Sequence, residues 1–308
     1  MSQQAPASPL RGHRPFPAGL FFPPLPRPAA IRDTGGLPNS LGRMGSLEVR
    51  LATSKKDIRK AQKLRFKVFY RDGGAKADPR AALTQRDICP FDKVCDHLLV
   101  VDHAAVNRFG RRKPKVVGVY RLLRQDKARE IGGFYSAGEF DIEPLLNRHV
   151  DKRFLELGRS CVHPDWRSKR VLELLWRGIW THVRHHRIDV LIGCASLPGT
   201  DPIAHAKVLR FLATEAAACE QWRASARADR RAPSMGIDTA LPDMAPIRTL
   251  LPPLVKGYLR VGAKFGDGAV VDRQFGTTDV LVIMPVAEID PRYKTYFTAA
   301  APLDILAA

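Results

Sequence analysis

A strand, a charged turn and a long amphipathic helix follow one another after residue 153, and this unit constrains the fold most. Residues 154–162 have the pattern of a strand that ends at His163-Pro164. Residues 171–185 place most of their apolar side chains on one face of a helix. Residues 189–195 are a short apolar run typical of a buried strand. A strand, a helix and a second buried strand in this order predict an α/β fold.

The rest of the chain extends this prediction to one domain. Residues 47–297 are expected to form a central mixed, twisted sheet flanked by helices, with a polar insertion near 220–247 and a tail at 298–308. Residues 1–46 hold nine of the 24 prolines and no lysine, and we expect a disordered Pro-rich leader. Further strands are predicted at 47–53, 98–101, 116–123 and 280–285, and further helices at 55–70, 201–217 and 254–261.

The charge balance points to an acidic partner. The chain has 50 Lys and Arg residues against 31 Asp and Glu residues, a net charge of +19. This excess suits nucleic acid, an anionic membrane surface, phosphates or an acidic protein. Nucleic-acid binding is the non-enzyme alternative, but the sequence has no zinc-finger, helix-turn-helix or aromatic-basic motif, so we expect no nucleic acid.

The cysteines and the hydropathy exclude two other classes of protein. Five cysteines, an odd number scattered along the chain, do not form a disulfide framework and indicate a reducing compartment. Cys89 and Cys95 have no second cysteine pair, so we expect no metal site. No run approaches the ~18 apolar residues that would span a bilayer.

The strand-turn-helix unit resembles the GCN5-related N-acyltransferase (GNAT) superfamily. The match lies in LELGRSCV followed by HPDWRSKR, where Val162, Pro164 and Arg167 fit the pattern V-x-P-x-x-R. The resemblance implies the GNAT fold, with an acyl donor bound where the strand passes into the helix. The implied donor-binding residues are Ser160, Cys161, Val162, Arg167, Lys169 and Arg170.

Two positions of the turn differ from the superfamily and bear on the donor. Arg170 and Leu172 stand where the family usually carries the glycines whose backbone N–H groups wrap the pyrophosphate of coenzyme A. We therefore expect a donor with one phosphodiester, the phosphopantetheine of an acyl carrier protein. Such carriers are acidic, which suits the positive charge.

A narrower resemblance is to the L-ornithine Nα-acyltransferases of ornithine-lipid synthesis, which are related to acyl-homoserine-lactone synthases. It rests on CDHLLVVD (95–102), GGFYSAGEFD (132–141), GCASLPGTDP (193–202) and FGDGAVVDRQFGTTDVLV (265–282). It implies transfer of a 3-hydroxyacyl group from acyl carrier protein to the α-amine of L-ornithine, giving lyso-ornithine lipid without a bound cofactor. It also implies a cytoplasmic enzyme that touches the inner membrane peripherally. An acetyl-coenzyme A N-acetyltransferase and a homoserine-lactone synthase are the alternative enzymes.

Aminolysis of a thioester needs a base, a polarised carbonyl and alignment. Glu156 is the predicted base, because it lies in an otherwise apolar strand and could act directly or through water. A regular strand places Glu156 and Arg159 on opposite faces, and a bulge at Gly158 would bring them to the same side. A buried Glu–Arg pair that only fixes the strand is the structural alternative. Backbone N–H groups near Cys161 and Val162 would meet the oxyanion.

The acceptor has a carboxylate and two amines. Arg65, Arg121 and Arg159 are the candidates for its carboxylate, because a guanidinium binds a carboxylate through two parallel hydrogen bonds. Asp96, Glu139 and Asp141 are candidates for the distal ammonium, and the sequence does not choose between them.

Overall fold

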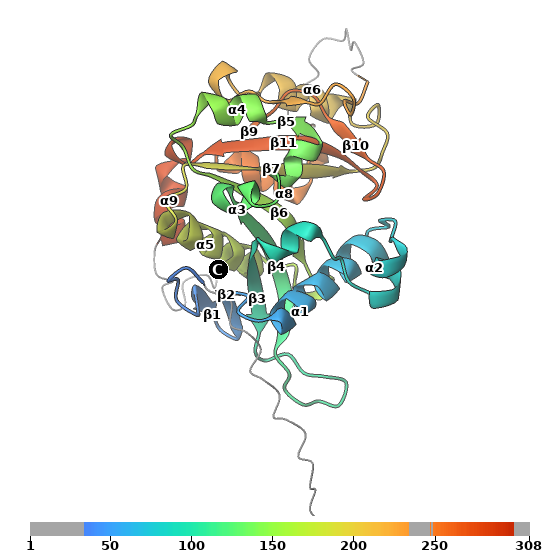
Figure 1. Cartoon of the computed structure of the whole chain (residues 1–308). Coiled ribbons are helices and arrows are strands. Elements are labelled where there is room, and N and C mark those ends of the chain that lie inside the picture. Colours follow the sequence, from blue (N-terminus) through green and yellow to red (C-terminus); the bar gives the residue numbers. More distant parts are fainter. Residues whose placement is uncertain (1–33, 234–246, 248, 299–308) are drawn as a thin grey trace, which may run out of the picture.

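A nine-stranded sheet forms the centre of the computed structural model, which describes residues 34–233, 247 and 249–298 (Figure 1). Its strands are β1 (Gly42–Met44), β2 (Leu47–Leu51), β3 (Asp96–Asp102), β4 (Lys115–Arg124), β6 (Phe154–Val162), β7 (Val190–Pro198), β9 (Lys264–Phe265), β10 (Val270–Asp272) and β11 (Thr277–Pro285). The order is β1-β2-β3-β4-β6-β7-β11-β10, and β9 pairs with β11. The paired strands are antiparallel except β6 and β7, so the sheet is mixed as predicted.

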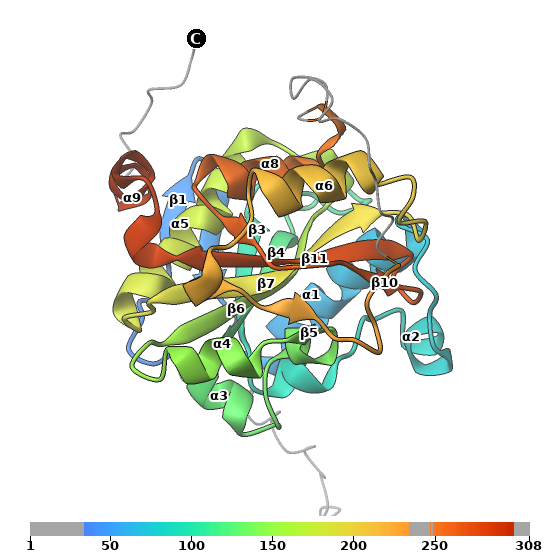
Figure 2. The ribbon, with the colours of Figure 1, turned by 90° about the horizontal axis from the view of Figure 1, so that it is seen from above.

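Helices cover both faces of this sheet (Figure 2). The described α-helices are α1 (Lys55–Arg65), α2 (Pro79–Thr84), α3 (Gln125–Arg129), α4 (Glu143–Arg148), α5 (Lys169–His185), α6 (Ala206–Thr214), α8 (Pro253–Arg260) and α9 (Pro291–Thr298). Apolar side chains of α5, α6 and α8 share one core, while α1 packs into another and α3 and α4 into a third. The predicted helix at 55–70 is real, but from Phe66 to Arg71 it continues as a π-helix.

Helix α5 forms where the sequence predicts it. Ser168 caps its start, because the Ser168 hydroxyl accepts a hydrogen bond from the Val171 N–H. Val171, Leu175 and Ile179 are fully buried against the sheet, as the helical period requires. Leu172, which the sequence placed on the apolar face, is instead 43% exposed.

The structure corrects the boundary of the predicted leader and shows how part of the predicted insertion packs. Part of the expected leader is ordered: β1 pairs with β2, and Leu37 and Leu41 are buried. Part of the expected insertion is also packed, because Trp222 is buried and the short strand β8 (Ser225–Ala226) pairs with β5 (Phe140–Asp141). In both cases a partner segment supplies burial and backbone hydrogen bonds that composition does not reveal. Residues 1–33, 234–246 and 299–308 lie outside the described part.

The separation of β6 from β7 creates the space for a site. The two strands pair only from Phe154 to Glu156, against Val190 to Ile192. Directly beyond this ladder, a Cβ on Gly193 would lie 2.3 Å from the backbone oxygen of Leu157. Only glycine permits this approach, and the strands diverge past it.

Gly193→Ala should therefore lower the free energy of unfolding by about 1–3 kcal/mol, because a Cβ there overpacks two backbones. Gly257→Ala in α8 is the matched control, since its added Cβ meets no atom within 4 Å. Urea denaturation of both variants measures the difference. An unchanged free energy of unfolding for Gly193→Ala would contradict this close approach.

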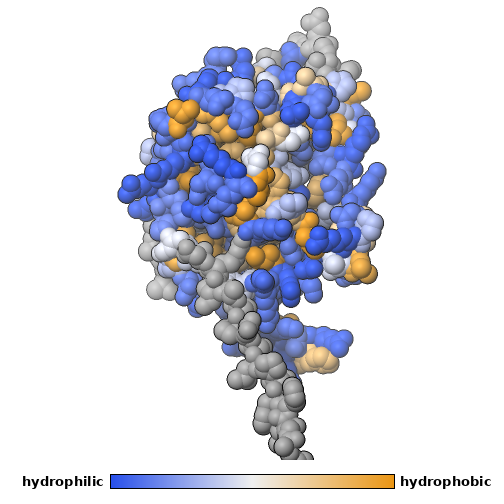
Figure 3. Space-filling view, viewed as in Figure 1, coloured by the Kyte–Doolittle hydropathy of each residue, from blue (hydrophilic) through white to orange (hydrophobic). Residues whose placement is uncertain are grey.

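No helix in the described part of the chain combines the length and the apolar character needed to cross a membrane. One face of the molecule is mainly hydrophilic, with apolar residues gathered toward its upper half (Figure 3).

Candidate active site

A cavity of about 350 Å³ opens where β6 and β7 separate. The strands contribute Glu156 to Ser160 on one side and Cys194, Ser196 and Pro198 on the other. Most of the remaining wall comes from four other parts of the chain: Val68, Phe69 and Gly73 after α1; Tyr120 and Arg121 of β4; Leu254 and Tyr258 of α8; and Asp272, Phe275, Gly276, Thr277 and Asp279 of β10, β11 and their turn. Tyr135 also lines it. The cavity thus collects polar groups from segments far apart in the sequence.

A bulge in β6 turns Glu156 and Arg159 toward this cavity together. Val119 pairs with Cys161 and Arg121 pairs with Gly158, so Arg159 and Ser160 both face Tyr120. Arg159 has a φ of +51°, the left-handed conformation. The predicted bulge is confirmed, but its left-handed residue is Arg159 rather than Gly158. A non-glycine residue held in this conformation is strained, which is common at functional sites.

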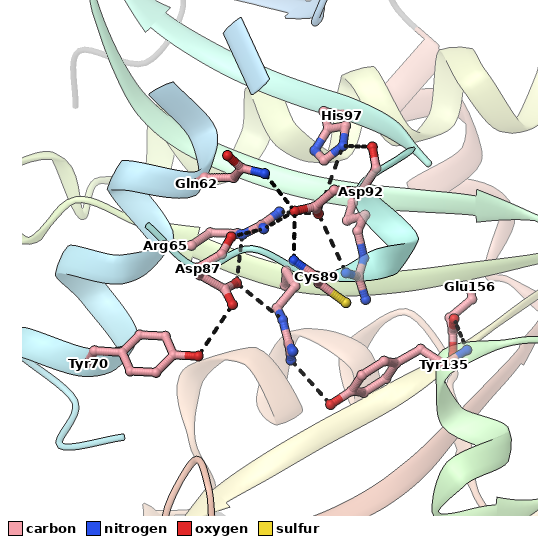
Figure 4. Close-up of polar contacts among 11 residues, drawn as sticks. Gln62, Arg65, Tyr70, Asp87, Cys89, Asp92, His97, Tyr135 and Glu156 are labelled. Carbon is pink, nitrogen blue, oxygen red and sulfur yellow. Dashed lines mark hydrogen bonds and ion pairs between the residues drawn. The ribbon is translucent and has the colours of Figure 1, made fainter. Parts of the chain in front are cut away.

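Glu156 is 4% exposed and firmly held. Its two carboxylate oxygens accept hydrogen bonds from the backbone N–H groups of Tyr135 at 2.8 Å and Ser136 at 2.7 Å. Figure 4 draws the bond to Tyr135. These bonds fix the direction of the carboxylate and leave further lone pairs free toward the cavity. This arrangement can position Glu156 as a base. The same two hydrogen bonds also hold the turn at residues 135–136 against β6.

The guanidinium of Arg121 lines the cavity beside Glu156. Arg121 is 3% exposed, and its guanidinium lies 5.5 Å from the ring centre of Phe91 and 5.4 Å from that of Tyr135. Its Nη1 lies 3.7 Å from an oxygen of Asp92, too far for a hydrogen bond, and has no hydrogen-bond partner. That buried Nη1 faces Asp92, whereas Nε and Nη2 lie beside Gly158 of the cavity wall, the side from which a substrate carboxylate would approach.

Arg159 supplies a second cation to the same cavity. Its guanidinium stacks on the rings of Tyr135 and Phe275. Its Nε lies 3.3 Å from an oxygen of Asp87, so part of its charge is already compensated inside the protein. Its position still adds positive charge to the wall that a carboxylate would approach.

Arg65 has another position, behind the cavity wall. It is 1% exposed and forms ion pairs of 2.8 Å with both Asp87 and Asp92 (Figure 4). Burial disfavours the Asp92 anion, but Arg65 more than compensates and holds the pKa of Asp92 well below its usual range. The structure therefore does not bring the predicted carboxylate ligand Arg65 to the cavity, because two internal carboxylates already occupy its guanidinium.

Asp96 lies in a different cluster from the cavity. Its carboxylate bonds His182 Nε2 at 2.9 Å, and His186 is the third potential metal ligand of this group. Arg124 lies 3.6 Å from Asp96 and 3.2 Å from His186 Nδ1, and its charge opposes a cation there. Burial lowers the pKa of His186 to about 4.

The other two predicted acids differ in position. Asp141 is exposed and outside the cavity lining. Glu139 is 5% exposed and accepts a hydrogen bond of 3.4 Å from the thiol of Cys194, which lines the cavity. The structure thus brings Glu139 next to the site.

The predicted donor residues form the far end of β6 and the start of α5. His163 N donates to Val117 O, so its N–H faces β4, and strand alternation turns the Val162 N–H to the opposite edge. Burial raises the pKa of Cys161 to about 12, which makes it a poor nucleophile. Arg167, Lys169 and Arg170 are exposed at the start of α5.

Sequence reasoning missed Tyr135, Cys194 and Asp279 as residues of the site. Tyr135 and Cys194 carry no sequence signal of their own, because each reaches the cavity only through the pairing of distant segments. Asp279 did carry a signal: it is an acid inside the apolar strand at 277–285, the same pattern that singled out Glu156.

Comparison with known proteins decides the family. The chain is 47% identical to an L-ornithine N(alpha)-acyltransferase of Rhizobium meliloti (strain 1021), over 89% of this chain and 92% of that protein. A protein of the same name from Brucella abortus (strain 2308) is 48% identical, over 85% of this chain and 92% of its own length. The chain belongs to the L-ornithine N(alpha)-acyltransferase family. It is an acyltransferase.

The match to a broader family agrees with the L-ornithine N(alpha)-acyltransferase assignment. Residues 64–177 match an acetyltransferase (GNAT) domain, which runs from the end of α1 to the middle of α5 and confirms the predicted fold class. Among solved structures, FeeM, an N-acyl amino acid synthase from uncultured soil microbes, superimposes with a TM-score of 0.45 and 10% identity, over 79% of this chain and 92% of that one.

Proposed function

We propose that this acyltransferase moves a 3-hydroxyacyl group from acyl carrier protein to the α-amine of L-ornithine, yielding lyso-ornithine lipid. Membership of the L-ornithine N(alpha)-acyltransferase family carries the proposal. The cavity supports it, because it combines the carboxylate of Glu156 with the guanidinium groups of Arg121 and Arg159. An amino acid with a carboxylate and an amine to be deprotonated needs both kinds of group.

The proposed reaction is direct aminolysis. Glu156 takes a proton from the α-ammonium, directly or through water. The freed amine attacks the thioester carbonyl, a C–N bond forms and the C–S bond breaks. The thiolate leaves on the carrier and takes up the second proton, which the nitrogen loses as the amide forms. No acyl-enzyme is needed, which agrees with the raised pKa of Cys161.

Three features orient the reacting groups in this proposal. Arg121 binds the ornithine carboxylate through the N–H groups that lie beside Gly158, and Arg159 adds positive charge beside it. The N–H of Val162 stabilises the oxyanion, since it faces the edge that β7 has left. Arg167, Lys169 and Arg170 attract the phosphodiester and the acidic surface of the carrier.

The test is a single assay of donor and acceptor. Purified protein receives 3-hydroxyacyl carrier protein and L-ornithine, and thiol release is followed together with the product mass. We expect thiol release coupled to an N-acyl-ornithine mass, with a carrier KM that rises with salt. Turnover with acetyl-coenzyme A alone, or with S-adenosylmethionine in place of ornithine, would contradict the proposal.

We further propose that the enzyme works in the cytoplasm against the inner membrane, through the loop between β3 and β4. This loop, residues 103–114, extends from the body of the molecule (Figure 1). Its tip exposes Val106 by 61% and Phe109 by 70%. Arg108, Arg111, Arg112 and Lys113 are exposed beside them, and residues 103–114 contain no acid. Apolar and cationic side chains together suit an anionic lipid surface.

Removing the aromatic side chain should weaken this contact. Phe109→Ser is expected to reduce sedimentation with vesicles containing anionic lipid about tenfold, because the tip loses its largest apolar group. The control is Leu83→Ser, which changes an even more exposed apolar side chain, on α2. Equal sedimentation of Phe109→Ser and the unmodified protein would remove the loop from this role.

A further inference from the structure

Three carboxylates meet at one wall of the cavity. Glu139, Asp272 and Asp279 come from the turn before β5, the end of β10 and the start of β11. One oxygen from each lies within 4.8 Å of the other two. Asp272 and Asp279 line the cavity, and Glu139 contacts Cys194, which also lines it. The cluster therefore faces the space in which the acceptor is proposed to bind.

Protein cations act on these carboxylates only from beyond ion-pair distance: Arg230 on Glu139 and Arg159 on Asp279. Within residues 34–233 and 249–298, no Lys, Arg or His forms an ion pair with any of the three. Arg159 lines the same cavity but lies against Asp87. Asp279 is 6% exposed. The side chains of Thr277 and Ser196 contact its carboxylate, but its buried Oδ1 accepts no hydrogen bond. An unpartnered buried carboxylate oxygen is costly, and natural structures rarely leave one without a ligand.

The titration of the cluster agrees with this deficit of positive charge. Burial raises the pKa of Asp279 to about 6. Burial, together with the nearby charge of Asp279, raises the pKa of Glu139 to about 7. A bound cation would favour the ionised forms and relieve the repulsion between them.

We infer that Glu139, Asp272 and Asp279 form the subsite for the distal ammonium of the acceptor amino acid, with Asp279 as its main ligand. An ammonium has three N–H donors and no acceptor, which matches three converging carboxylates. Arg121 on β4 and Asp279 on β11 line the cavity from either side of β6 and β7. Arg121 complements the α-carboxylate of a diamino acid, and Asp279 complements its distal ammonium. The inference rests on the proposed function. In it, the three carboxylates select ornithine over amino acids that have no distal amine.

The test compares two acceptors of equal length. Norvaline has the carbon chain of ornithine without the distal amine. The measured quantity is the ratio of kcat/KM for ornithine to kcat/KM for norvaline, which is independent of the fraction of enzyme that is folded. Asp279→Asn should lower this ratio about 10- to 100-fold, because one charge-assisted contact is lost. Asp272→Asn should lower it in the same direction, and it retains an oxygen for the N–H groups of Gln274 and Phe275.

Asp141→Asn is the matched control, since Asp141 is an exposed acid near the cluster in sequence but outside the cavity. Its ratio should equal that of the unmodified protein. A second readout is thermal unfolding without substrate: Asp279→Asn should melt no lower than the unmodified protein, because a buried repulsion is removed.

Three outcomes would overturn the inference. An unchanged ratio in both Asp279→Asn and Asp272→Asn would remove the cluster from acceptor selection. An equal loss of rate with both acceptors would make Asp279 part of the proton transfer instead. Loss of activity on chelation that Mg²⁺ or Ca²⁺ restores would assign the cluster to a divalent cation. Failure of the unmodified protein to acylate ornithine would instead reject the proposed function, so the two failures are distinguishable.

Discussion

Glu156→Gln should lower kcat for acyl transfer about 100-fold or more, because the variant cannot take the proton from the α-ammonium. The carboxylate is buried, lines the cavity and is held in place by the N–H groups of Tyr135 and Ser136. Steady-state kinetics with the carrier thioester and ornithine measure the loss. Glu130→Gln is the control, since Glu130 is an exposed carboxylate paired only with Lys127 in the described structure.

The pH dependence separates a base from a purely structural group. The amide introduced by Glu156→Gln would retain one acceptor oxygen for two backbone N–H groups, so a structural role alone also predicts some loss. If Glu156 is the base, activity of Glu156→Gln should recover with rising pH, because the amine then loses its proton to solvent. A loss that is the same at every pH would contradict the base role and favour the alternative, a group that only fixes β6 and the 135–136 turn.

Arg65→Met should lower the free energy of unfolding by about 3–5 kcal/mol, because it leaves Asp87 and Asp92 buried without their shared cation. Arg65 is 1% exposed, and the side chains of both acids are at most 5% exposed. Methionine fills most of the volume and stays apolar, so the loss reports on the charge rather than on a cavity. Lys63→Met on the same helix is the control, since Lys63 is exposed.

The loss in Arg65→Met should also depend on pH. In the unmodified protein the pKa of Asp92 is held well below its usual range, chiefly by Arg65 against the effect of burial. The stability that this gives is fully present above the ordinary aspartate pKa of about 3.9 and is lost as the pH falls below it. The difference between the two proteins should therefore shrink below about pH 4. Chemical denaturation at several pH values tests this, and a difference that stays constant from neutral pH down to about pH 3 would contradict the assignment.

The sequence predicts those strands and helices that show a clear hydrophobic periodicity within their own residues. Strand 154–162 has the predicted bounds, and the predicted helix at 171–185 begins two residues earlier, at the Ser168 cap. Glu156 and Arg121 were identified because burying a charged side chain in an apolar strand costs free energy, which suggests a functional or structural role. The same reasoning applied to 277–285 would have identified Asp279.

The sequence does not predict which charges neutralise one another. Arg65 matched the pattern for a carboxylate ligand, yet it pairs with Asp87 and Asp92, which lie 22 and 27 residues later. Glu139, Asp272 and Asp279 meet only because β5, β10 and β11 assemble around the cavity. The leader boundary failed for the same reason, since residues 42–44 are ordered by the partner strand β2.

The most direct measurement is a crystal structure of the protein with N-(3-hydroxyacyl)-ornithine, the proposed product. The central claim is that acyl transfer takes place where β6 and β7 separate. We expect the amide in the cavity near Glu156, the carboxylate against Arg121 and the distal ammonium against Asp279. Product bound elsewhere, with the cavity unoccupied, would contradict the account.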